Sequence, residues 1–142
     1  LADGRLAVMA DASVERAGPE RWAAAVADAA TRWQADRIVA EANNGGEMVR
    51  SVLQAADADL PVQLVHASRG KAARAEPVAM LYSQGRVIHC GTFPRLEDEM
   101  CGLTGGGRYA GPGRSPDRAD AMVWALWALN RGAQNEPGIR RL

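Results

Sequence analysis

The apolar residues of this 142-residue chain recur at two different spacings. In some segments they stand three or four positions apart, as Trp22, Val26 and Ala29 do, and this repeat is typical of an amphipathic helix. In others, short apolar runs such as residues 38–40 lie between charged residues, as in buried strands. The two spacings predict helices at residues 19–34, 47–58, 71–84, 94–101 and 116–131, and strands at residues 5–11, 36–41, 61–66 and 86–90.

Strands alternate with helices along the chain, which is typical of an α/β domain whose parallel sheet is flanked by helices. A turn signal at Asp3-Gly4 comes before the first strand. We therefore expect an antiparallel hairpin element at one side of the sheet, and a chain that begins inside that hairpin. The length favours one domain, which we assign to residues 1–132, followed by a C-terminal tail at residues 133–142.

Composition narrows the class of protein. Seventeen Lys and Arg residues balance seventeen Asp and Glu residues, so net charge alone gives no sign of nucleic-acid binding. Hydrophobic residues make up 47% of the chain, which is enough for a core, but no apolar run is long enough to span a membrane. Cys90 and Cys101 provide neither a disulfide framework nor a zinc site, which favours a reducing, cytoplasmic compartment. Lys71 is the single lysine beside many arginines.

Three acidic residues are candidates for chemistry. Glu41 ends a predicted strand, at the edge where open α/β sheets bind ligands, although a solvent-facing charge is the ordinary alternative. Asp117 and Asp120 stand three apart at the start of the last predicted helix, so both can reach one metal ion. Acidic residues also favour helix starts through the helix dipole. That alternative suits Asp120 poorly, because an apolar run follows it directly, and a hard cation such as Mg²⁺ would suit it better.

A basic turn at Arg69, Lys71 and Arg74 opens the third predicted helix. Backbone N–H groups at a helix start, together with three cations, suit a phosphate, and the alternative is a solvated helix start. The glycine-rich segment at residues 105–108 favours a flexible linker over a phosphate loop.

No catalytic or ligand-binding role is predicted for the remaining histidines, acidic residues and tryptophans discussed next. His66 and His89 lack the ligand spacing of a zinc site. The acidic run at residues 97–99 is typical of a solvated helix face, and the four tryptophans have the helical spacing of core or interface residues.

Three stretches together resemble the C-terminal nuclease domain of phage-type terminase large subunits, the DNA-packaging motors of tailed phages and of related gene transfer agents. They are DRIVAEANNGGEMV (residues 36–49), VHASRGKAARAEPVAMLYSQGRVIHCGTFPRLEDEMC (residues 65–101) and SPDRADAMVWAL (residues 115–126). The resemblance covers about residues 6 to 129, and the three stretches follow one another in the family's order.

The resemblance implies an RNase H-like mixed sheet with flanking helices and a carboxylate cluster that binds two Mg²⁺ or Mn²⁺ ions. Glu41 matches the acid at the end of the family's fourth strand. Asp117 and Asp120 match the pair on its last helix, and Asp120 is the better match. Lys71, with Arg69 and Arg74, falls in the family's SRGK-type basic segment, where contact with the DNA backbone is implied. The implied reaction is two-metal hydrolysis of a phosphodiester bond in concatemeric double-stranded DNA.

One departure from the family pattern affects the expected activity. The family's first acid lies on a strand that would precede Leu1, and Asp11 is not an equivalent. We therefore expect the sheet to lack its first central strand, and the isolated chain to have little or no nuclease activity. Exposed strand edges are templates for pairing, so residues 5–11 would move toward residues 36–41, or a second copy of the chain would pair there as a homo-oligomer.

The implied partners are double-stranded DNA, a portal protein and a small terminase subunit, in the host cytoplasm at the procapsid portal and away from any membrane. Two alternatives remain open at this point. One is another RNase H-like nuclease, such as a Holliday-junction resolvase. The other is a non-catalytic α/β module that docks DNA or a portal ring without cutting.

Overall fold

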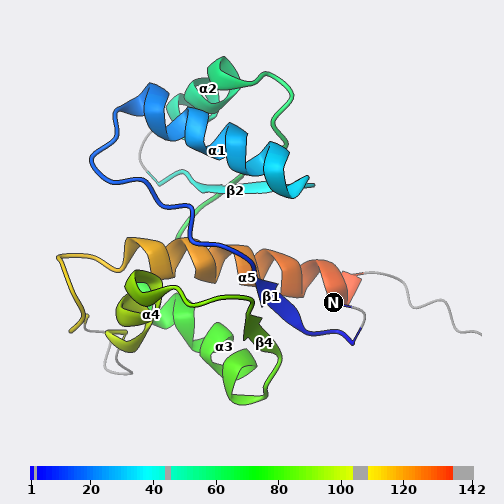
Figure 1. Ribbon diagram of the computed structural model, residues 1–142, viewed down its shortest axis with the longest axis vertical. Coiled ribbons are helices and arrows are strands. Elements are labelled where there is room, and N and C mark those ends of the chain that lie inside the picture. The colour runs from blue at the N-terminus through cyan, green and yellow to red at the C-terminus, as the bar shows by residue number, and fades with distance from the viewer. Residues whose placement is uncertain (2, 44–45, 104–108, 136–142) are drawn as a thin grey trace, which may run out of the picture. The chain divides into compact units, whose positions relative to one another are not determined.

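The computed structural model describes residues 1, 3–43, 46–103 and 109–135, with side chains described as far as residue 131. Contacts divide the chain into two compact units, which we call the middle unit (Ala12–Ser68) and the outer unit (Leu1–Asp11 with Arg69–Leu142). The elements in the described ranges are β1 (Leu6–Val8), α1 (Pro19–Trp33), β2 (Ile38–Glu41), α2 (Gly46–Ala56), β3 (Val62–Val65), α3 (Lys71–Ser83), β4 (Val87–His89), α4 (Pro94–Cys101) and α5 (Asp117–Asn135) (Figure 1).

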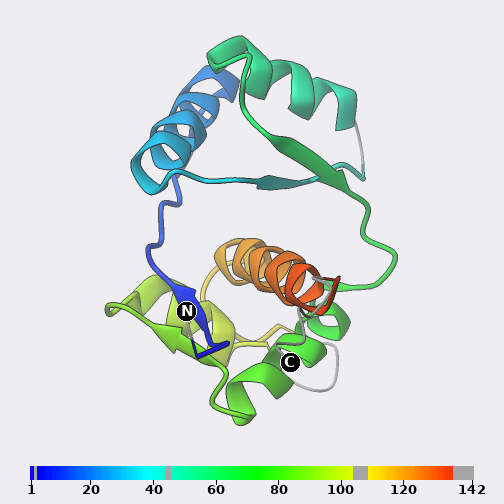
Figure 2. The ribbon, with the colours of Figure 1, turned by 90° about the vertical axis from the view of Figure 1, so that its right-hand side faces the viewer.

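The middle unit is a β–α–β arrangement with a second helix. Strands β2 and β3 pair in parallel, with Ile38 beside Val62 and Glu41 beside Val65, and α2 makes the crossover between them. Helices α1 and α2 cover the same face of this two-stranded sheet (Figure 2). The apolar stripe that predicts α1 packs there, and Leu53 of α2, which is 1% exposed, lies in this core. Burying one such leucine side chain contributes about 1.5–3 kcal/mol.

The outer unit is built around α5. Strands β1 and β4 pair in parallel, and α5 contacts β1, α3 and α4. The core is formed by apolar side chains from all of these elements: Val8, Val78, Leu81, Val87, Leu96, Ala119, Val123 and Leu126. Because α5 supplies three of these residues at helical spacing, its position is fixed by burial along one face.

The predicted α/β class is confirmed, and each predicted helix is present within a few residues of its expected bounds. Local sequence signals explain where helix α1 begins and ends. Pro19 occupies the first turn of α1, where a missing N–H costs nothing, and Gln34 ends that helix in the left-handed conformation with φ of 48°. Helix α3 runs as one helix through Pro77. Helix α5 continues to Asn135, and residues 136–142 of the predicted tail lie outside the described part of the chain.

The expected pairing of the first strand is wrong. The chain does turn before this strand, since the N–H of Gly4 donates to the carbonyl of Leu1 at 3.0 Å and Gly4 has φ of +78°, but Asp3 has no positive φ, so the hairpin turn expected at Asp3-Gly4 does not form. Strand β1 pairs in parallel with β4, with Ala7 beside Ile88, instead of forming an antiparallel element. It also does not pair with β2, whose partner in the described ranges is β3. A turn signal fixes the chain reversal but not the partner of the strand that follows, which apolar burial decides.

Candidate active site

Asp117 and Asp120 both lie in the first turn of α5, as the sequence predicts. The helix begins after Pro116, whose carbonyl accepts the N–H of Asp120 at 2.9 Å. The two acids nevertheless have different surroundings, because the Asp120 side chain is 10% exposed and the Asp117 side chain is 77% exposed.

Glu99 of α4 holds the start of α5 in place. Its Oε2 accepts the backbone N–H of Arg118 at 2.8 Å and that of Ala119 at 3.2 Å, and its Oε1 accepts the Arg118 side chain at 3.2 Å. The first N–H groups of a helix have no partner within the helix, so this carboxylate caps α5 from a neighbouring helix. Glu99 is only 5% exposed, so the expectation of a solvated acidic face is wrong for this residue.

Arg74 of α3 pairs with the buried acid. Its Nη2 donates to both Oδ1 and Oδ2 of Asp120, each at 2.7 Å, and its Nη1 donates to the carbonyl of Arg69 at 2.7 Å. The Arg74 side chain is 11% exposed, and its guanidinium lies over the Trp124 ring, 5.2 Å from the centroid. The charge of Asp120 is therefore balanced inside the protein.

Lys71, the first residue of α3, pairs with the exposed acid. Its Nζ donates to Oδ1 of Asp117 and, at 2.8 Å, to Oγ of Ser115, and it lies 3.8 Å from Oδ2 of Asp120. Ser115 also donates to Asp117 at 2.7 Å. Hydrogen bonds from Lys71 and then from Ser115 hold the pKa of Asp117 below its usual range. The starts of α3 and α5 thus meet through two cations and two acids, which we call the α3–α5 charge cluster (Lys71, Arg74, Asp117 and Asp120).

Glu41 belongs to the middle unit, where it is the last residue of β2. The Nδ2 of Asn43 donates to Oε1 of Glu41 at 2.8 Å, and the Oδ1 of Asn43 accepts the N–H of Ala67 at 2.7 Å. Asn43 therefore connects the end of β2 to the segment after β3 and holds the Glu41 carboxylate at the carboxyl edge of these strands. This edge is the location that the sequence predicts for Glu41.

The predicted basic residues have unequal surroundings. Arg69 is exposed, Lys71 is partly exposed and Arg74 is almost fully buried. The Gly105–Arg108 segment, for which the sequence favours a linker, lies outside the described residues. Within the ranges that the structure describes, no three His, Cys, Asp or Glu side chains gather closely enough to hold a metal ion.

A second polar network lies away from these residues. Tyr82 Oη is 2.6 Å from Nε2 of His89, and Nδ1 of His89 is 2.9 Å from Oε1 of Glu97. Burial first, and then the charge of Glu97, raise the pKa of Tyr82 to about 12, so its hydroxyl stays protonated at neutral pH. The hydrogen bond from His89 and that from the N–H of Phe93 hold the pKa of Glu97 below its usual range. This network stabilises the outer unit and offers no nucleophile.

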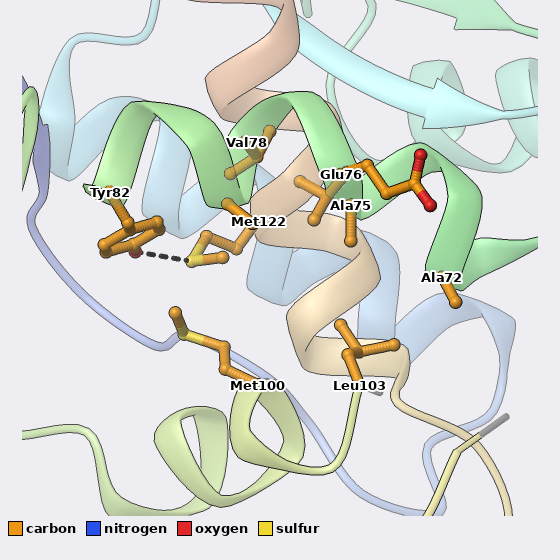
Figure 3. A pocket seen from close by; sticks show the side chains of 10 residues that line it. Ala72, Ala75, Glu76, Val78, Tyr82, Met100, Leu103 and Met122 are labelled. Carbon is orange, nitrogen blue, oxygen red and sulfur yellow. Dashed lines mark hydrogen bonds between the residues drawn. The ribbon is translucent and has the colours of Figure 1, made fainter. Parts of the chain in front are cut away.

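Next to it, a pocket of about 300 Å³ lies among α3, α5 and the end of α4 (Figure 3). Its lining is mostly apolar and includes Tyr82, Met100, Leu103 and Met122, and Tyr82 Oη donates to the sulfur of Met122 at 3.2 Å. None of the acids or cations predicted from the sequence lines it. The pocket therefore gives no support for a ligand site at the predicted residues.

Three residues that support the candidate site residues have no sequence signal of function. Glu99 stands in an acidic run, Trp124 stands in the apolar run of α5, and Asn43 is one of two adjacent asparagines. Only their contacts with residues far away in the chain identify them. Ser115 precedes α5 and donates to the side chain of Asp117.

In the described part of the chain, no helix is both long enough and apolar enough to cross a membrane.

Searches of curated proteins and of solved structures return no match. The sequence model of one family, described as the terminase RNaseH-like domain, matches residues 1–129, which is most of the chain and includes every candidate site residue. The chain belongs to the family of terminase RNaseH-like domains.

Proposed function

We propose that this chain belongs to the metal-dependent endonuclease domain of a phage-type terminase large subunit, which cuts concatemeric double-stranded DNA during packaging, and that the isolated chain has little or no activity. The observation that carries the proposal is the buried carboxylate of Asp120 beside Asp117 in the first turn of α5, in a chain of the terminase RNaseH-like family. A buried carboxylate is unfavourable for stability unless it is paired, and Arg74 and a divalent cation are both partners of the required charge.

Asp117, Asp120 and Glu41 are the residues that we propose as ligands of Mg²⁺ or Mn²⁺. Their chemistry fits, because hard divalent cations prefer carboxylate oxygens. When bound, such ions lower the pKa of an attacking water and stabilise the charge that develops on the phosphate. The chain holds its own ligands in place with hydrogen bonds, from Asn43 to Glu41 and from Arg74 to Asp120. At Asp117 a divalent ion competes with the ammonium group of Lys71.

The basic turn before α3 is proposed to contact the DNA backbone. Arg69 is exposed in this turn, and Lys71 begins the helix directly after it. Phosphate contacts of this kind position DNA without reading its sequence. We further propose that the domain works with a portal protein and a small terminase subunit in the cytoplasm of the phage host.

Titration of the protein with Mn²⁺ by isothermal calorimetry tests the metal site. Asp120→Asn and Glu41→Gln remove one negative charge each and keep the side-chain shape. We choose Asn over Ala because the amide oxygen of Asn can still accept a hydrogen bond from the buried Arg74 guanidinium, whereas Ala offers no acceptor. The expected result is Mn²⁺ binding that weakens at least about tenfold in each variant, since each loses one charged ligand.

Asp98→Asn is the matched control, because Asp98 is an exposed acid on α4. Its Mn²⁺ affinity should equal that of the unchanged protein. Failure of the unchanged protein to bind Mn²⁺ at millimolar concentration would overturn the proposal and favour a non-catalytic docking module. Equal binding by Asp120→Asn and Asp98→Asn would show that the ligands are wrong.

A further inference from the structure

We propose that Arg74 is a positioning residue, which fixes the carboxylate of Asp120 from inside the protein, and that it does not contact DNA phosphate. This inference rests on the proposed function, because it concerns the residue proposed as a metal ligand on α5. It separates Arg74 from Arg69 and Lys71, with which it shares the basic segment of the sequence.

The first argument is the use of the guanidinium donors. Both terminal nitrogens of Arg74 are engaged within the outer unit, Nη2 with the two oxygens of Asp120 and Nη1 with the carbonyl of Arg69. A phosphate is bound most strongly by two parallel N–H donors of one guanidinium. Both pairs of parallel donors include Nη2, whose N–H groups are used on Asp120, so a two-donor phosphate contact would break these hydrogen bonds at an arginine that is 11% exposed.

The second argument is the aromatic ring under the guanidinium. Trp124 lies one turn after Asp120 on α5, so a single helix supplies both the carboxylate and the ring that hold Arg74. Trp124 is itself held by an edge-on contact with Trp127, with ring centroids 5.4 Å apart and an interplanar angle of 90°. The plane of the guanidinium and the direction of its hydrogen bonds are fixed together.

The third argument is that this pairing leaves Asp120 able to bind something else. A carboxylate offers about four lone-pair sites, and Arg74 uses one on each oxygen. Each oxygen therefore keeps capacity for a further ligand while its orientation is set by the arginine. Lysine cannot do the same, because an ammonium group has no planar fork and stacks poorly on an indole ring.

The test uses two kinds of variant, because loss of a positive charge by itself would favour cation binding. Arg74→Lys and Trp124→Leu keep the net charge and disturb only the geometry. We expect Mn²⁺ affinity to fall about tenfold in Arg74→Lys and about threefold in Trp124→Leu, which corresponds to the loss of a cation–π contact. Arg86→Lys is the matched control, since Arg86 also contacts α5, at Asn130, away from the acids.

Arg74→Gln removes the charge and tests contact with DNA. The affinity for a DNA duplex is measured over a range of salt concentrations, and each lost phosphate contact lowers the slope of log K against log salt by about 0.9. We expect Arg74→Gln to keep the wild-type slope. In Arg69→Gln the slope should be less steep, by about one unit of log K per unit of log salt. The thermal midpoint of every variant shows whether it is folded at the temperature of the assay.

The outcomes separate this inference from the proposed function. Wild-type Mn²⁺ affinity in a folded Arg74→Lys protein, or a lower salt slope in Arg74→Gln, overturns the positioning role and leaves the metal site intact. A wild-type protein that binds no Mn²⁺ overturns the proposed function and this inference with it. A loss of Mn²⁺ affinity in Arg86→Lys equal to that in Arg74→Lys identifies a general weakening of the outer unit and also overturns the inference.

Discussion

Lys71 and Arg74 stand about one turn apart on α3. Each pairs with one acid of α5, and the two pairs differ in their exposure to solvent. The inner pair of Arg74 and Asp120 is nearly buried, with side chains 11% and 10% exposed. The outer pair of Lys71 and Asp117 is open to solvent, because the Asp117 side chain is 77% exposed. An exposed ion pair contributes about 1 kcal/mol or less, whereas breaking a buried one is strongly destabilising. The outer pair is therefore the part of the cluster that an incoming cation can replace.

Lys71→Met should raise the affinity of the protein for Mn²⁺ by about fivefold. The substitution removes the cation that occupies Asp117, and at about 4 Å one unit charge changes the interaction energy by roughly 1 kcal/mol in water. Stability should change little. Calorimetric titration with Mn²⁺ measures the affinity, and Lys71→Arg, which keeps the charge, should match the unchanged protein. Weaker Mn²⁺ binding by Lys71→Met would contradict competition between Lys71 and the metal ion.

At the scale of helices and strands, the sequence predicts elements well and pairings poorly. The stripe through Trp22, Val26 and Ala29 predicts α1 because helical spacing is a local property of the chain. Whether β1 pairs with β4 or with another strand depends on contacts between residues about 80 positions apart, such as Leu6 and Val87. No local pattern contains that information, since a strand presents the same backbone donors and acceptors to any partner.

Glu99 links two elements, and its loss should weaken the start of α5. In Glu99→Ala the N–H groups of Arg118 and Ala119 lose their acceptor in a buried place. We expect a loss of about 2–3 kcal/mol in the free energy of unfolding, because unsatisfied buried donors and a missing helix cap each destabilise. Urea denaturation measures the difference, with the exposed neighbour substituted as Asp98→Ala for comparison. A Glu99→Ala protein as stable as Asp98→Ala would exclude the capping role.

For the molecule as a whole, the residue types of the candidate site are predictable, but its assembly is not. The sequence identifies Glu41 by its strand end and Asp120 by the apolar run that follows it, since both signals are local. The contacts that join the α3–α5 charge cluster span 46 to 49 positions of the chain, and they form only because α3 and α5 pack together. The sequence therefore places Arg74 among DNA contacts, whereas tertiary packing turns its side chain toward Asp120.

The set of acids in the whole chain also predicts its activity in isolation. Asp117, Asp120 and Glu41 match acids of the terminase pattern, whereas the acid that the resemblance implies for the first strand has no match in the sequence. Hydrolysis assisted by two metal ions needs several carboxylates around them. We therefore expect little or no cleavage of supercoiled plasmid DNA by this 142-residue chain in 10 mM Mg²⁺ or Mn²⁺, at roughly the level of Asp120→Asn. Gel electrophoresis over several hours measures nicked and linear products. Robust cleavage that disappears in Asp120→Asn would contradict this expectation and show that the carboxylates present are sufficient for catalysis.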